Sequence, residues 1–272
     1  MCIRDRNDIV RCSVAAHDVL TVPNIRVEIS TSSWRPPVCY AIYNQIKQEV
    51  IAARYTLFEG IEGFEKKDGR SHFSDKDVFL YDMMDHRVYG IWVEKVKMAI
   101  LMAYTAFDKI AYLVNYYWGR GLKERDISIN RVWSSNSGKS LAKIFVDRKN
   151  YPLRGLYWLS KDLGYYKDKD VDEENLKPEA SVLCDIRNHL GHKYLAVYDD
   201  IAFSFSDMWE ADGLAYPISE SELIQKATSL IRLARNALVY ISAAIHIEEM
   251  QHEDSNVMLG GMELKLWKKG AR

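Results

Sequence analysis

The chain has 272 residues and a mass of 31.5 kDa, enough to bury a sizeable core as one large domain or as one domain with an extension. Its hydrophobic content of 48% excludes an intrinsically disordered chain, and its net charge of −1 with a pI of about 6.7 excludes a general basic field that would recruit nucleic acid. Any nucleic-acid site must therefore be a local patch. The cysteines lie in no paired or metal-type spacing, which is typical of reduced thiols in a cytoplasmic protein: Cys2, Cys12, Cys39 and Cys184.

Residues 1–36 show no sustained period and are expected to form an N-terminal arm. The first six residues, MCIRDR, contain no apolar run of the kind that a signal peptide requires. Because this hexapeptide is similar to a translated adapter sequence, we expect the start of the chain to be partly non-native or truncated.

A long first helix is predicted over residues 38–59, where apolar side chains recur at helical spacing. Gly60, Gly63 and Gly69, with charged residues between them, predict a loop after it. A second helix is predicted over residues 75–118, with a break or kink at Gly90 and an N-cap at Ser74 or Asp75.

Residues 91–118 are apolar almost all round, which is typical of a helix packed on several sides. Residues 98–118 are the best candidate for a membrane span, but Asp108 and Lys109 at their centre exclude it, because each charge would cost about 2.5–3.5 kcal/mol there. The polar residues Tyr104, Asp108, Tyr112 and Asn115 repeat at three or four residues and therefore share one face. They either form buried hydrogen bonds to neighbouring helices, or Asp108 pairs with Arg187 and orients it.

An irregular insert is predicted over residues 119–149, with one short helix near 139–147. It carries eight basic against three acidic side chains and is the best local patch for an RNA backbone, with Trp133 as a stacking surface. Solvated loop charge is the alternative. The basic residues are Arg120, Lys123, Arg125, Arg131, Lys139, Lys143, Arg148 and Lys149.

Further helices are predicted over residues 153–163, 178–190 and 219–252, followed by a basic tail at 254–272. Alternation at 194–198, 202–205 and 214–218 predicts a small β-hairpin. The fold class is therefore an all-α antiparallel bundle with an inserted irregular segment.

The helix at 178–190 carries Arg187, Asn188 and His192 near its end. Gly191 is predicted to stop this helix in a left-handed conformation, so that His192 folds back toward Arg187. An arginine fork binds phosphate oxygens at two points, and a histidine with a pKa of roughly 6.5 moves a proton near neutral pH. This combination suits metal-free cleavage of RNA by its own 2′-hydroxyl group, with Asn188 as an uncharged donor and acceptor.

The spacing alone is weak, since Arg11 and His17 also match it, but the residues around it carry a resemblance. Arg-x4-His with Asn188 after the arginine, followed by Lys193 and Tyr194, resembles the HEPN superfamily (higher eukaryote and prokaryote nucleotide-binding domains). The segment at 103–112, AYTAFDKIAY, resembles its LA2681-like branch.

The resemblance implies a HEPN-like helical domain over residues 37–253 and a metal-independent endoribonuclease without cofactors. It implies a homodimer in which two motifs build one composite site, and an intracellular defence or toxin role with a neutralising or regulatory partner. By position, Arg187, Asn188 and His192 inherit catalytic roles. Tyr104, Asp108 and Tyr112 would support them, and the RNA contacts would be Lys193, Arg120, Lys123, Arg125 and Arg131.

Two other classes remain open: a non-catalytic RNA- or nucleotide-binding module, and an interaction scaffold whose motif helix seals a dimer. A further alternative, for the motif alone, is that His192 only caps its helix. Three other signals are set aside. Residues 137–140 lack the first glycine and the strand of a phosphate-binding loop and are expected to cap a helix. The set His246, Glu249 and His252 and the set Cys184, His189 and His192 lack metal-site spacing. The first of these two sets is expected to be a charged helix end.

Overall fold

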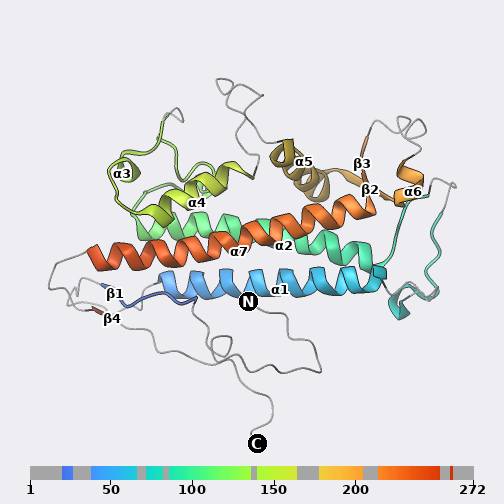
Figure 1. The fold of residues 1–272 in the computed structure, drawn as a ribbon, viewed down its shortest axis with the longest axis horizontal. Helices are drawn as coiled ribbons and strands as arrows, with labels where there is room; N and C mark the ends of the chain where they lie inside the picture. The colour runs from blue at the N-terminus through green and yellow to red at the C-terminus, as the bar shows by residue number, and fades with distance from the viewer. Residues whose placement is uncertain are drawn as a thin grey trace, which may run out of the picture.

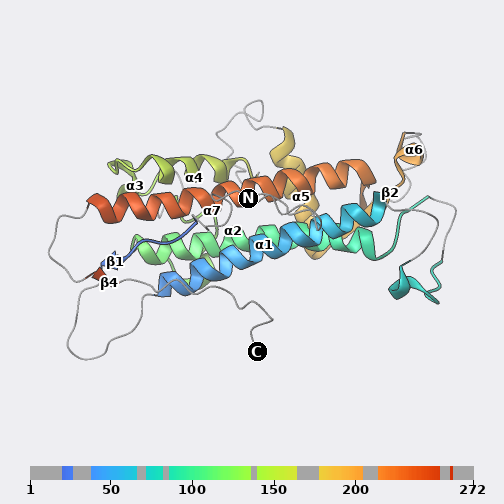
Figure 2. The same cartoon turned by 60° about the horizontal axis from the view of Figure 1, so that its bottom comes forward.

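Three long helices form the frame of the protein in its computed structural model, which describes residues 20–26, 38–65, 72–81, 86–135, 140–163, 178–204, 214–251 and 258–259. They are α1 (Val38–Glu65), α2 (Ile91–Tyr117) and α7 (Glu220–Gln251), and each packs against the other two. Helices α2 and α7 run in one direction and α1 runs in the other (Figure 1). Figure 2 shows the same three helices side by side after a rotation. The predicted all-α bundle is thus confirmed.

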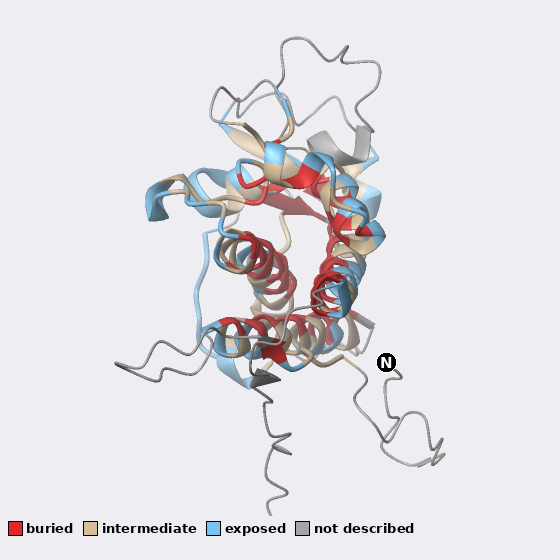
Figure 3. Cartoon of the chain, turned by 90° about the vertical axis from the view of Figure 1, so that its left-hand side faces the viewer, coloured by how far each residue is buried: buried red, intermediate tan, exposed pale blue. Residues whose placement is uncertain are grey.

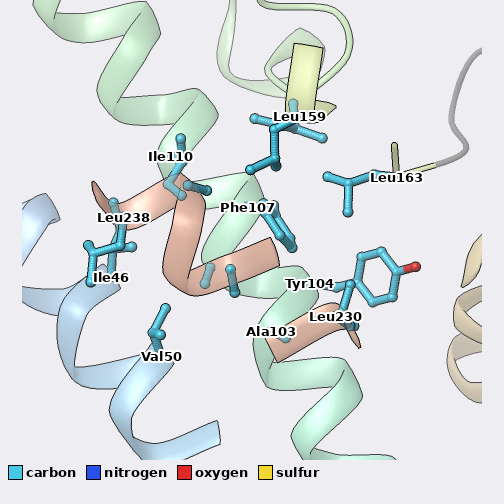
Figure 4. Close-up of a cluster of buried hydrophobic side chains, with 14 of the residues drawn as sticks. Ile46, Val50, Ala103, Tyr104, Phe107, Ile110, Leu159, Leu163, Leu230 and Leu238 are labelled. Atoms are coloured by element: carbon cyan, nitrogen blue, oxygen red, sulfur yellow. The ribbon is translucent and has the colours of Figure 1, made fainter. Parts of the chain in front are cut away.

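The core lies where the apolar faces of these helices meet. Figure 3, which looks along the bundle, shows the buried residues on the helix sides that face one another. In Figure 4, side chains from α1, α2 and α7 interdigitate, and Leu159 and Leu163 join them from a fourth segment. Ile46, Phe107 and Ile110 have no exposed surface at all. Burial of such side chains stabilises the fold by roughly 1.5–3 kcal/mol each.

Shorter elements cover this frame. Helix α4 (Tyr151–Lys161) packs on α7, and helix α5 (Pro178–His192) packs on α2. The insert after α2 holds a 3₁₀ turn at Glu124–Asp126 and the short helix α3 (Lys143–Val146), which lies within the predicted 139–147.

The glycines at 60 and 63 lie inside α1, so the predicted loop at this point is wrong. A Cβ atom at Gly63 would lie 2.0 Å from Cδ2 of Trp92, and one at Gly60 would lie 2.8 Å from Cγ2 of Val96. Because both partners belong to α2, these glycines let the two helices approach closely. Glycine in this helix therefore serves packing rather than chain reversal.

The second helix begins at Ile91 and not near residue 75. The chain instead forms a 3₁₀ turn at Phe73–Asp75 and then has no regular structure over residues 78–81. Asp75 does act as a helix cap, because its Oδ2 accepts a hydrogen bond of 3.1 Å from the backbone N–H of Ile91. Gly90, with φ of 123°, marks the predicted break.

Two strands lie near the predicted positions, but they do not form a hairpin. Strand β2 (Tyr194–Tyr198) pairs in parallel with β3 (Ala215–Ser219). The alternation at 202–205 misled the prediction: Asp199 accepts a hydrogen bond from the N–H of Ile201 and starts helix α6 (Asp200–Phe203). Because helix α6 follows β2, no tight turn joins the two strands, and β3 can run parallel to β2.

Part of the predicted N-terminal arm packs on the bundle. The side chain of Ser242 donates a hydrogen bond of 2.7 Å to the carbonyl of Thr21, and Tyr40 donates one of 3.0 Å to the carbonyl of Pro23. Strand β1 (Ile25–Arg26) pairs antiparallel with β4 (Met258–Leu259) from the predicted tail. The rest of the arm at 1–36 and of the tail at 254–272 lies outside the described residues.

Among the described helices, α7 and not the helix over residues 98–118 has the length and hydropathy of a membrane span. Half of its most apolar window is buried inside the bundle. Its apolar residues are therefore accounted for by packing against α1 and α2.

Candidate active site

Helix α5 continues through Gly191 to His192, so the predicted helix stop is wrong. The N–H of Lys193 still donates a helical hydrogen bond of 3.2 Å to the carbonyl of His189. Gly191 does not adopt a positive φ, and no atom lies within 4 Å of the place where its Cβ would be. Strand β2 begins at Tyr194, and its pairing with β3 fixes the exit of the chain. His192 therefore does not fold back toward Arg187.

Arg187 lies between α5 and α2, as the pairing hypothesis expects. Its Nη2 is 3.5 Å from Oδ2 of Asp108, and its guanidinium carbon lies 5.4 Å from the ring centre of Tyr104. Tyr104 points its hydroxyl away from the core cluster (Figure 4) and donates a hydrogen bond of 2.7 Å to the carbonyl of Leu183. The side chain of Arg187 is 33% exposed, so it is not sealed inside the protein.

Asn188 and His192 lie on a different side of α5 from Arg187. Five residues turn an α-helix by about 140°, whereas the four residues from Asn188 to His192 turn it by only about 40°. Both residues are exposed, and Nδ2 of Asn188 lies 3.6 Å from Sγ of Cys184. His189, to which the motif gives no role, contacts the ring of Tyr216 in β3 at 5.1 Å. One copy of the chain thus presents the arginine and the histidine in different directions.

Tyr112 does not join Arg187, although it shares the helix face of Asp108. Its hydroxyl donates a hydrogen bond of 3.3 Å to the carbonyl of Glu124 in the insert. Asn115 likewise turns to the insert, where its Oδ1 accepts a hydrogen bond of 2.9 Å from the N–H of Leu122. The polar face of α2 therefore serves two purposes: Tyr104 and Asp108 contact α5, and the next two polar residues anchor the insert.

The predicted RNA-binding residues are not equivalent in the structure. Arg120 is directed inward and donates hydrogen bonds to the carbonyls of Val132 and Ser134, while Arg131 pairs with Asp126 at 3.1 Å. Lys193 is exposed directly after α5. Lys123 and Arg125 are exposed and, with Tyr112 and Glu124, line an open hollow of about 580 Å³.

Trp133 is not a stacking surface. It is 1% exposed and contacts Phe145 at 5.2 Å and Tyr157 at 5.8 Å between ring centres. A large aromatic ring in an irregular insert gains more by joining the hydrophobic core than by remaining in water. The local sequence pattern could not predict this burial, because Phe145 and Tyr157 are distant from Trp133 in the sequence.

The predicted charged end of α7 holds acidic side chains that are packed inside the protein. Glu248 and Glu249 are buried, and Glu249 accepts a hydrogen bond of 2.6 Å from the hydroxyl of Tyr117. His246 contacts the carbonyl of Thr21 at 3.2 Å. His252 and residues 136–139 lie outside the described part of the chain. Within that part, no group of three or more His, Cys, Asp or Glu side chains is placed to hold a metal ion.

Arg87 is a cation near the motif that the sequence analysis missed. It hydrogen-bonds to the hydroxyl of Tyr194, two residues after His192, and lies 5.7 Å from the ring centre of Tyr198. Its backbone forms an isolated bridge to Tyr198. No periodic signal marks Arg87, since only the course of the chain before α2 brings it to β2.

Burial raises the pKa of Asp108 above its ordinary value, and the positive charges of Arg187 and Lys109 offset only part of this effect. When the pKa of a carboxyl group is higher in the folded than in the unfolded chain, the group contributes its full stabilisation at pH values below the unfolded pKa. This stabilisation is lost as the pH rises through the folded pKa. Asp108→Asn is therefore expected to leave the thermal midpoint at pH 7 unchanged or higher. Any increase in the thermal midpoint of Asp108→Asn over the unaltered protein should shrink as the pH falls toward the pKa of the unfolded carboxyl group, near 4.

Thermal unfolding followed by circular dichroism between pH 4 and 8 measures this difference. Asp147→Asn, at an exposed position, is the control. A midpoint at pH 7 that falls by several degrees would mean that the ion pair with Arg187 outweighs the cost of burying Asp108.

The model of the LA2681-like HEPN family matches residues 30–248, which include helix α2, the insert and the motif helix α5. Searches of curated proteins and of solved structures found no match.

Proposed function

The chain belongs to the LA2681-like HEPN family, and from that premise we propose that it is a metal-independent endoribonuclease. In the proposed reaction the 2′-oxygen attacks the adjacent phosphorus and the bond from phosphorus to the 5′-oxygen breaks. The 2′-hydroxyl proton passes to a base, and the leaving 5′-oxygen receives a proton from an acid. The products are a 2′,3′-cyclic phosphate and a 5′-hydroxyl.

The observation that carries the proposal is the placement of Arg187. Asp108 and Tyr104 hold one side of its guanidinium group, and a third of the side chain remains exposed. A guanidinium that is held in place binds phosphate oxygens with less loss of side-chain freedom and stabilises charge on the phosphorus centre. Arg187 would thus bind the scissile phosphate, His192 would transfer protons and Asn188 would position the substrate.

A dimer would bring together the groups that one copy presents in different directions. Arg187 and His192 of one helix are about 140° apart around its axis, so a second copy packed against α5 would supply the missing group. We therefore propose a homodimeric ribonuclease that acts in the cytoplasm.

A role in intracellular defence or in a toxin–antitoxin pair, with a neutralising or activating partner, is proposed on the family alone. Exposed Lys193, Lys123 and Arg125 would add phosphate contacts near the site. Arg120 and Arg131 already bond to groups within the insert, so we propose no RNA contact for them.

The decisive experiment is cleavage of a mixed pool of single-stranded and structured RNA in EDTA. We expect the unaltered protein to produce 2′,3′-cyclic phosphate ends, which mass spectrometry identifies, and His192→Ala to lose at least 10²-fold in rate. Both proteins should have the same thermal midpoint, because His192 is exposed.

Equal mixing of Arg187→Ala with His192→Ala tests the dimer. If each site takes its arginine and its histidine from different copies, the mixed dimers should restore about a quarter of the activity. Activity that survives both single substitutions would remove the mechanism. RNA that is bound but never cleaved would instead favour a non-catalytic RNA-binding module.

A further inference from the structure

Helix α4 has one buried face and one exposed aromatic face. Leu153, Leu156 and Leu159 are buried against the bundle. On the other side, Tyr151 is 77% exposed and Trp158 is 64% exposed. Tyrosine and tryptophan rings are enriched at interfaces, so two of them on one exposed helix face are a candidate interaction surface.

Cationic groups alternate with these rings. Tyr151, Arg154, Trp158 and Lys161 follow one another at three- or four-residue steps, so they form one stripe along the helix. The guanidinium carbon of Arg154 lies 6.0 Å from the ring centre of Tyr151, and Nζ of Lys161 lies 5.3 Å from that of Trp158. Residues 149–161 contain three basic and no acidic side chain. The stripe therefore combines flat apolar surfaces with positive charge.

The exposed tryptophan is supported by its neighbours. The ring of Tyr157 contacts Trp158 at 5.6 Å on one side and the buried Trp133 at 5.8 Å on the other. The three rings form a ladder from the core of the insert to the surface. Such backing limits the rotamers of Trp158 and prepares its outer surface for a ligand at a low entropic cost.

Stacking surfaces separated by cations are the arrangement that single-stranded RNA requires, because its bases stack on the rings while its phosphates meet the charges. We propose that the stripe Tyr151, Arg154, Trp158 and Lys161 is a binding subsite for single-stranded RNA, an inference that rests on the proposed function and names its substrate class. Seven residues separate the two exposed rings by about 10 Å along the helix. The rings therefore take bases from separate positions of one strand.

The position of α4 suits a substrate that also reaches the motif. In Figure 1, α4 and α5 lie on the same side of the α2 and α7 pair, with α4 over one half and α5 over the other. A strand bound along this side would contact the stripe first and then pass toward Arg187. The stripe would hold single-stranded segments and so favour cleavage in or beside them.

The test measures binding of a labelled 12-nucleotide uridine RNA by fluorescence anisotropy, with every variant made in the His192→Ala background so that the RNA stays intact. Trp158→Ala is expected to raise the Kd about tenfold, the effect of losing one stacked base, while Trp158→Phe should retain most of the affinity. Arg154→Gln should reduce the slope of log Kd against the logarithm of the salt concentration by about 0.7, the value for one phosphate contact of a single strand.

Phe79→Ala is the matched control, because Phe79 is a 93% exposed aromatic residue in the segment between α1 and α2. It should change the Kd less than twofold. An unchanged Kd in Trp158→Ala overturns the subsite, and so does a change from dimer to monomer at unchanged RNA affinity, which would make the stripe a protein interface.

The two proposals fail in different ways. RNA that depends on Trp158 for binding but is never cleaved by the unaltered protein would support the subsite and overturn the ribonuclease. Cleavage with cyclic phosphate ends, together with RNA binding that does not depend on Trp158, would support the ribonuclease and overturn the subsite. Absence of RNA binding in any form of the protein would overturn both.

Discussion

Replacing Arg187 by lysine is expected to slow RNA cleavage by about 10²–10³-fold, the cost of removing one donor that stabilises the charge of a transition state. The guanidinium group has enough N–H donors to face Asp108 and lie over the ring of Tyr104 while it binds a phosphate. A lysine ammonium is a single point charge and cannot maintain these contacts together. The rate constant should therefore fall more than the affinity for RNA does.

Single-turnover cleavage at saturating protein separates these two effects. Arg232→Lys is the matched control, since it makes the same change at an exposed position of α7 and should cleave RNA normally. The thermal midpoint should move by no more than a few degrees in either variant, because Arg187 is only partly buried. A variant Arg187→Lys that retains a third or more of the activity would show that any cation suffices at this position.

The helical frame was readable from the sequence because its signals are local. Apolar periodicity marked α1, α2, α5 and α7. The contact between Arg187 and Asp108 was one of two alternatives for the polar face of α2, and the family resemblance favoured it. Glycine was the unreliable signal. Gly63 looked like a loop residue and Gly191 like a helix stop, yet both are helical. Their difference lies in what surrounds them, since Gly63 faces Trp92 and Gly191 faces open space.

The identity of the exposed tryptophan could not be predicted from local pattern. Trp133 stands in a basic insert and was predicted to be a stacking surface, whereas no prediction singled out Trp158 in helix α4. Burial depends on which rings meet in three dimensions, and here Phe145 and Tyr157 cover Trp133. The parallel pairing of β2 with β3 escaped prediction for the same reason, because pairing direction depends on the chain between the strands.

The buried carboxylates near the end of α7 were missed because their partners are distant in sequence. Glu248 accepts hydrogen bonds of 3.3 Å from Nε1 of Trp118 and from Nδ2 of Asn150, and it forms an ion pair with Arg148. Asn150 also donates a hydrogen bond of 2.8 Å to the carbonyl of Ala244 and caps the start of α4. Glu248 thus joins α2, the insert and α4 to α7, and the network positions the helix that carries the aromatic stripe.

Glu248→Ala is expected to reduce the free energy of unfolding by about 3–5 kcal/mol, because it leaves the Arg148 charge and two buried N–H donors without their common acceptor. Urea denaturation followed by circular dichroism measures this loss. Glu248→Gln keeps an acceptor oxygen without the charge and should lose less. Glu94→Ala removes a carboxylate from a surface pair with Lys97 and should stay within about 0.5 kcal/mol of the unaltered protein. A loss below 1 kcal/mol in Glu248→Ala would mean that water replaces the carboxylate at little cost, and that α4 depends on its leucines alone for its position.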